Sequence, residues 1–149
     1  MAARVIFFIL LIMPVDAQAP WVGVWKLNAS KSTAPSDRYK RVITKIEPWE
    51  DGLKVSYEMV GLRGGVSHLE WIGRFDGMDY PVEGADYIVT NAYTRLSDQS
   101  YEIAVKVEGA LASTARVEVS QDGKTLTSVT TQKNAQGRTT VTSSVYDRQ

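Results

Sequence analysis

The stretch that decides the fold is Trp21-Val22-Gly23-Val24-Trp25-Lys26-Leu27-Asn28. Gly23 lies two residues before Trp25, and a missing side chain there lets another backbone segment or a ring approach closely. The indole of Trp25 is large enough to close one end of a small barrel. We therefore expect this stretch to be the first strand of a β-barrel, with the last strand of the chain closing beside it.

Glycine-containing turns divide the rest of the chain at regular intervals. They are Asp51-Gly52, Gly64-Gly65, Asp76-Gly77, Glu108-Gly109, Asp122-Gly123 and Gln136-Gly137. Asp-Gly and Gly-Gly pairs are preferred in tight hairpins because their central residues take positive φ. Several successive turns are about 12–14 residues apart, which predicts consecutive long strands joined by short hairpins.

The segments between the turns have the period-two alternation of strands. The clearest is 101–108, in which Tyr101, Ile103, Val105 and Val107 alternate with more polar neighbours. This alternation is typical of a half-buried antiparallel strand. Further strands are predicted at 39–47, 53–60, 66–75, 87–94, 112–120, 125–132 and 139–147, with long connections at 29–38 and 76–86.

These segments predict an all-β fold. No stretch after the leader shows a sustained helical period, so no substantial helix is expected. A sandwich tends to need long crossover connections, whereas an up-and-down barrel removes its free edges by closing. We predict an up-and-down antiparallel β-barrel of about eight to ten strands, which is large enough to hold one small ligand.

Residues 1–19 have the features of a secretory signal peptide. A positive start is followed by an apolar run at Val5–Val15, about half the length of a membrane span, and then by small residues. Cleavage after Ala19 would leave Pro20 as the first mature residue, and proline is unfavourable directly after a cleavage site. We therefore expect cleavage after Ala17. The alternative is a buried N-terminal strand or an uncleaved anchor. The expected protein is secreted or periplasmic, with residues 20–149 forming a single barrel domain.

Composition excludes several classes of function. The chain has 17 basic and 17 acidic residues and a net charge of zero, so no basic patch for nucleic acid is expected. The chain has no cysteine, which excludes disulfides and cysteine metal ligands. Its single histidine supplies too few ligands for a typical transition-metal site. We expect no metal, no cofactor and no stable membrane insertion once the leader is removed. The sequence leaves the oligomeric state open.

Both ends of the chain resemble the calycin superfamily, which covers lipocalins and fatty-acid-binding proteins. Gly23-Val24-Trp25 resembles the Gly-x-Trp of the first strand, and 144–148 resembles the last strand of a fatty-acid-binding protein. Trp25 to Asn28 and Phe75 to Val82 also resemble small secreted bacterial lipocalin-like proteins of unassigned role. The resemblance implies a barrel that holds a small apolar or amphipathic molecule without catalysis.

The last strand departs from the fatty-acid-binding proteins in one important way. Those proteins hold a carboxylate with an Arg-x-Tyr pair, and the corresponding positions here are Ser144 and Tyr146, so the arginine is absent. The connection at 29–38 is also too short for their two helices. Periodicity alone directs Val141 and Val145 inward, whereas the resemblance directs inward the residues Thr140, Thr142, Ser144 and Tyr146.

The candidate site residues lie on the apolar faces of the predicted strands. A hydrophobic pocket would be lined by Tyr57, Met59, Trp71, Tyr101 and Ile103, with Tyr146 orienting the ligand; the alternative is an ordinary filled core. For barrel closure, we expect Gly23, Trp25 and Arg148 to meet, with a guanidinium over an indole.

Two other functions remain open at this stage. The barrel could be packed shut and act through its loops as a protein-interaction module. It could instead be a small enzyme of isomerase or hydrolase type, which would need His68 to face inward beside a carboxylate. His68 shares a strand face with Glu70 and Arg74, and we expect this face to be exposed surface. No catalytic residue is assigned.

Overall fold

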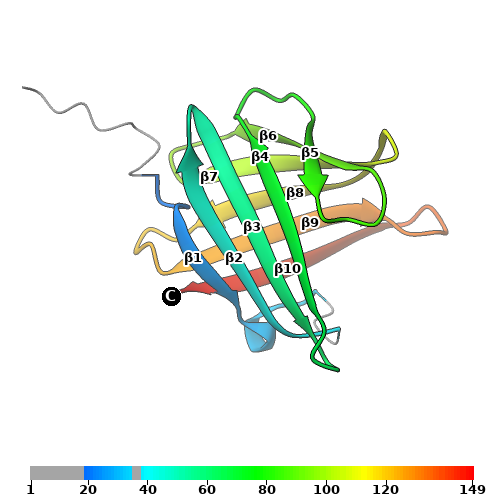
Figure 1. Cartoon of the computed structure of the whole chain (residues 1–149), viewed down its shortest axis with the longest axis horizontal. Coiled ribbons are helices and arrows are strands. Elements are labelled where there is room, and N and C mark those ends of the chain that lie inside the picture. Colours follow the sequence, from blue (N-terminus) through cyan, green and yellow to red (C-terminus); the bar gives the residue numbers. More distant parts are fainter. Residues whose placement is uncertain (1–18, 35–37) are drawn as a thin grey trace, which may run out of the picture.

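The computed structural model describes residues 19–34 and 38–149, and within them ten antiparallel strands form a closed barrel (Figure 1). The strands are β1 (Gly23–Leu27), β2 (Tyr39–Trp49), β3 (Gly52–Gly61), β4 (Val66–Gly73), β5 (Tyr80–Glu83), β6 (Val89–Arg95), β7 (Ser100–Val107), β8 (Ala110–Val119), β9 (Thr125–Lys133) and β10 (Thr139–Arg148), with one short 3-10 turn, η2 (Ala29–Lys31). Each strand pairs with its neighbours in sequence, and β10 returns to pair with β1. The predicted up-and-down barrel is confirmed.

The predicted signal peptide falls almost entirely on residues 1–18, which lie outside the described residues. Ala19 is the exception, and it packs against the hydrophobic core while its carbonyl accepts a hydrogen bond from the Val22 amide. Among the described residues, no helix has both the length and the apolar character needed to cross a membrane.

The segment at 76–86 was predicted to be a long connection, and this prediction is wrong in part because it contains β5. This strand has four residues and only two residue pairs with β4 and two with β6. Pro81 lies within it and cannot donate a backbone hydrogen bond to the ladder. A short strand with a central proline lacks the alternation that identifies the longer ones, so the sequence pattern missed it.

One end of the barrel is filled by aromatic rings. Trp71 stacks on Tyr93 with ring centroids 3.8 Å apart, and Tyr93 stacks in turn on Tyr101 at 5.2 Å. Trp21 meets Tyr101 edge to face and Phe75 with a tilted ring. Because these large rings leave little space between them, this end is closed.

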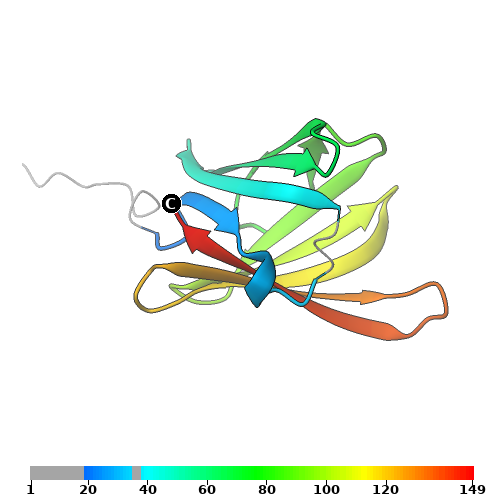
Figure 2. The same ribbon diagram turned by 90° about the horizontal axis from the view of Figure 1, so that it is seen from below.

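The opposite end is formed by the β3–β4, β5–β6, β7–β8 and β9–β10 turns, and we call it the mouth. In both views the β9–β10 hairpin extends past the other strands at this end (Figures 1 and 2). Inward positions near the mouth, including Met59 and Thr142, are only partly buried. The barrel is therefore packed at one end and accessible at the other.

The inner face of β10 follows the family resemblance rather than the hydrophobic periodicity. Tyr146 pairs with the buried Leu126 and packs against the core, whereas Val141 is 62% exposed. Alternate residues of a strand share a face, so the inward pairs toward the mouth are Ser144 with Ser128, Thr142 with Thr130, and Thr140 with Gln132. Toward the mouth, the inner wall made by β9 and β10 is therefore polar.

Candidate ligand-binding site

A cavity of about 60 Å³ lies inside the barrel. It is lined by Thr44, Ile46, Val55, Tyr57, Tyr101, Ile103, Val117, Leu126, Ser128 and Tyr146. These residues come from six strands, β2, β3, β7, β8, β9 and β10, and their alternate neighbours face outward. The wall is mostly apolar with five hydroxyl groups.

The structure brings together four of the six residues that the sequence singled out for a pocket: Tyr57, Tyr101, Ile103 and Tyr146. Trp71 does not line this cavity. Its ring is stacked on Tyr93, and its indole N–H donates to the Asn91 carbonyl at 3.1 Å, so it belongs to the filled end of the barrel. Met59 lies outside the cavity lining, one inward position beyond Tyr57 toward the mouth.

The tyrosine hydroxyls of the interior cluster around Tyr57. Burial raises the pKa of Tyr57, and burial together with the nearby Tyr57 raises the pKa of Tyr93 and of Tyr101 well above the ordinary value. The same two causes raise the pKa of Tyr146 to about 12. All four side chains are therefore uncharged at neutral pH and can donate hydrogen bonds.

Several buried polar atoms in this region have no hydrogen-bond partner. They include Thr44 Oγ1, Asn91 Oδ1 and the Tyr93 hydroxyl, which lies near Tyr57 without meeting hydrogen-bond geometry. Leaving such an atom unpartnered is costly, and native structures contain few of them. Thr44 is 7% exposed and lines the cavity, so its unpartnered hydroxyl lies where a molecule in the cavity would meet it.

Sequence reasoning missed Thr44 and Tyr93. Thr44 lies on the inward face of β2 between Val42 and Ile46, so the alternation at 39–47 could have placed it inside. Tyr93 lies on β6, whose alternation is poor because Asn91, Ala92 and Tyr93 are all buried in a row. Its completely buried ring was therefore not evident from the pattern.

At the closed end, Arg148 connects the last strand to the first strand and to the residues before it. The guanidinium carbon of Arg148 lies 4.2 Å from the centroid of the Trp25 ring. Arg148 also donates hydrogen bonds to the carbonyls of Pro20, Val22 and Gly123. Gly23 leaves room for this side chain, because a Cβ atom at that position would contact Arg148 Nη1.

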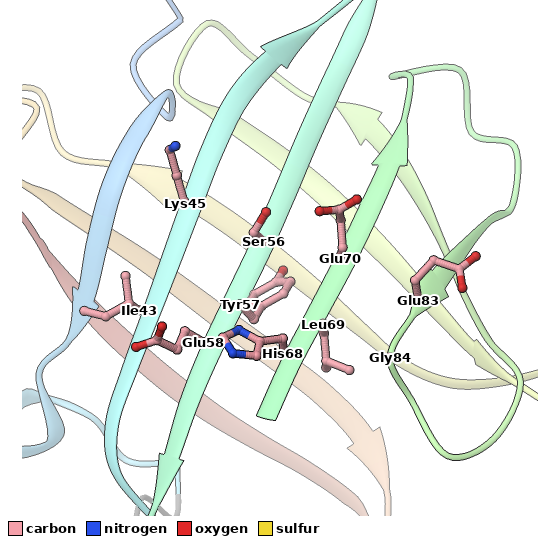
Figure 3. A pocket seen from close by; sticks show the side chains of 10 residues that line it. All are labelled: Ile43, Lys45, Ser56, Tyr57, Glu58, His68, Leu69, Glu70, Glu83 and Gly84. Atoms are coloured by element: carbon pink, nitrogen blue, oxygen red, sulfur yellow. The ribbon is translucent and has the colours of Figure 1, made fainter. Parts of the chain in front are cut away.

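A second, open groove of about 510 Å³ runs over β2, β3 and β4 and reaches the end of β5 at Glu83 (Figure 3). It is lined by Ile43, Lys45, Ser56, Tyr57, Glu58, His68, Leu69, Glu70, Glu83 and Gly84. Two of its carboxylates are already paired: Glu58 with Arg41 at 2.7 Å and Glu70 with Lys54 at 3.1 Å. Ion pairs of this exposed kind contribute little and are typical of ordinary surface.

The groove contains His68 and Glu70 but not Arg74, the third residue of the polar face that the sequence predicted around the single histidine. His68 is exposed on the outer face, directly across from Glu58 in the β3–β4 pairing. Arg74 instead bonds Asp51, with 2.7 Å between its Nε and the carboxylate. Within the described parts of the chain, no group of three or more histidine and acidic side chains is arranged to hold a metal ion.

Comparison with known proteins identifies the fold. No protein-family model matches the sequence, and no curated protein matches it. Among solved structures, the chain is similar to the zebrafish ileal bile acid-binding protein complexed with cholic acid, with a TM-score of 0.56 and 15% sequence identity over 87% of this chain and 99% of that chain. At this identity the likeness shows the fold alone, and it agrees with the closed ten-stranded antiparallel barrel of this chain.

Proposed function

We propose that this protein is a non-catalytic binding protein that holds a small apolar or amphipathic molecule inside its barrel. The observation that carries this proposal is the interior cavity, where an apolar wall is combined with a free, buried hydroxyl at Thr44. Binding sites for small molecules usually have such a mostly apolar lining with a few polar groups that fix orientation. The solved barrel with the same fold contains cholic acid, which supports the proposal by analogy.

The size of the cavity sets a condition on this function. Ligand pockets usually have volumes of roughly 300–1,000 Å³, and the cavity here has about 60 Å³. A ligand of more than a few atoms must therefore also occupy the space between the cavity and the mouth. Met59 lies on that path and is partly buried, and its unbranched side chain adapts readily to a new neighbour.

The site of action that we propose is the periplasm or the extracellular space. The support is the apolar leader with its small residues before Pro20. Ala19 and Pro20 both make contacts within the folded barrel, which is compatible with cleavage after Ala17. Sequencing the N-terminus of the exported protein tests this part of the proposal independently of ligand binding.

The test of binding is native mass spectrometry of the full-length gene product after export, purified without detergent. We expect a reproducible extra mass that is lost on denaturation. Titration with the neutral fluorophore Nile red then checks whether the purified barrel accepts an apolar probe. A clean mass for the protein alone, together with no Nile red binding, contradicts the proposed function.

A second candidate is a barrel that acts as a protein-interaction module. The observation that favours it is a set of exposed apolar side chains near the mouth: Leu62, Val66, Tyr87, Ile88 and Leu111, each more than half exposed. Exposed apolar side chains that gather in one region often mark interaction sites. A barrel that binds no small molecule, but loses a copurifying protein when Leu62 and Ile88 are both changed to Ser, would favour this candidate.

A further inference from the structure

We infer that the molecule held in the barrel carries an uncharged hydrogen-bonding end group, such as an alcohol or a ketone, which lies in the interior cavity against Thr44 and the tyrosine hydroxyls. This inference rests on the proposed function, and it specifies the chemical class of the ligand. It excludes a carboxylate or an ammonium as the group that lies at the inner end of the site.

The hydroxyl groups that would hold this end group come from opposite walls of the barrel. Thr44 and Tyr57 are directly paired across β2 and β3, with both side chains on the inward face. Tyr101 on β7 and Tyr146 on β10 also lie near Tyr57. Burial and this nearby tyrosine together raise the pKa of both. A group in the cavity is therefore surrounded by hydroxyls from four strands.

Thr44 indicates that this cluster is incomplete without a further partner. Its Oγ1 is buried and unpartnered, and a nearby hydroxyl of a bound molecule would satisfy it. The cavity of about 60 Å³ exceeds the roughly 10–15 Å³ that one water needs. It therefore has room for a polar end group and a few carbon atoms, with the remainder of the molecule directed toward Met59 and the mouth.

The absence of charge in the lining decides the class of end group. Among the described residues that line the cavity, none has a charged side chain at neutral pH. Nearby cations lie on the outer face, where Arg41 is paired with Glu58 and Lys54 with Glu70. A carboxylate in the cavity would therefore be buried without a counter-charge, which is strongly unfavourable, and the same holds for an ammonium.

The tyrosines keep the site neutral over a wide pH range. The pKa of each interior tyrosine is raised, so their hydroxyls stay protonated well into alkaline pH. They can donate to a carbonyl or both donate to and accept from an alcohol. They offer no anion to pair with a cationic ligand.

The experiment compares two probes with the same carbon chain, 1-decanol and decanoic acid, as competitors of Nile red on the full-length protein. At about pH 7.5 we expect decanol to compete at least about tenfold better than decanoate, because only the acid is ionised there. At about pH 4 the acid gains its proton, and we expect the difference to shrink while decanol competes as before. The variants Thr44→Val and Tyr57→Phe should weaken decanol several-fold, and the matched exposed variant Tyr87→Phe should not.

The outcomes separate the two proposals. Decanoate that competes as well as decanol or better at neutral pH overturns the neutral end group but leaves the barrel a binding protein. Decanol binding that is unaffected by both Thr44→Val and Tyr57→Phe, with folding checked by circular dichroism, also overturns the assigned position. If neither probe competes and Nile red itself does not bind, both the end-group assignment and the proposed function fail.

Discussion

Arg148 on the last strand lies over Trp25 on the first, with the guanidinium carbon 4.2 Å from the centroid of the indole ring. The same side chain donates to carbonyls of Pro20 and Val22 at the start of the chain and of Gly123 in the β8–β9 turn. One arginine therefore connects three segments at the closed end of the barrel. Direct pairing of β1 with β10 covers only three residue pairs, so this contact reinforces a short seam.

We predict that Arg148→Ala lowers the free energy of unfolding by about 1–3 kcal/mol, because it removes the cation–π contact and three charge-assisted hydrogen bonds at a partly solvated site. Arg148→Lys should recover part of this loss, since it keeps the charge but cannot make all three donations. Urea unfolding measures the change. Arg63→Ala in the exposed β3–β4 turn is the matched control, and an equal effect of both variants would contradict a special role for Arg148.

Gly23 is predicted to be coupled to Arg148. A Cβ atom at Gly23 would contact Arg148 Nη1, and the φ of +148° is one that other residues rarely adopt. Gly23→Ala should therefore destabilise the barrel by more than Gly109→Ala, whose φ is +82° but whose added Cβ meets nothing within 4 Å.

The coupling itself is measured by a double-mutant cycle. In an Arg148→Ala background, the cost of Gly23→Ala should fall, because the contact with the guanidinium is gone and only the backbone strain is left. A cost that is the same in both backgrounds would show that backbone conformation alone makes Gly23 necessary.

The barrel was predictable because its determinants are local in sequence. Regular glycine turns and period-two alternation specify hairpins between neighbouring strands, and in this topology nearly every pairing is between neighbours. β5 was missed because it is short and contains Pro81, so its place depends on the strands beside it rather than on its own pattern.

The site was only partly predictable. Tyr57, Tyr101 and Ile103 follow from alternation, but the inward face of β10 does not, because its wall is polar and the apolar Val141 faces outward. In this strand hydrophobic periodicity predicts the wrong face. Tyr93 gains its importance from stacking on Trp71, and the Thr44 hydroxyl from having no partner inside the barrel. Neither property is evident from the pattern of a single strand.

Thr44→Val is predicted to leave the free energy of unfolding unchanged or to raise it by up to about 1 kcal/mol. The substitution replaces a buried, unpartnered hydroxyl with a methyl group of similar size, which removes a desolvation cost without leaving a cavity. Thermal unfolding of Thr44→Val and of the exposed variant Thr94→Val checks this. A loss of more than about 1 kcal/mol at Thr44 would show that its hydroxyl has a structural partner, such as a bound water.

Alkaline pH should destabilise the barrel through its interior tyrosines. Burial raises the pKa of Tyr146 to about 12, from an ordinary value of 10.0. Below about pH 10 both the folded and the unfolded chain keep this proton, and between about pH 10 and 12 only the folded chain keeps it. The unfolded state then binds fewer protons, so the free energy of unfolding decreases as pH rises, by up to about 1.4 kcal/mol per pH unit for each such tyrosine.

Urea unfolding at a series of pH values, together with the ultraviolet absorbance of tyrosinate, measures this effect. Tyr146→Phe removes one of the titrating groups. It should make the decrease in the free energy of unfolding above about pH 10 less steep, by at most about 1.4 kcal/mol per pH unit. Tyr87→Phe, which changes an exposed ring, is the matched control and should leave the slope unchanged. An interior that ionises together with the exposed tyrosines, without unfolding, would show that the four hydroxyls are not sequestered from water, and the neutral binding site would lose its basis.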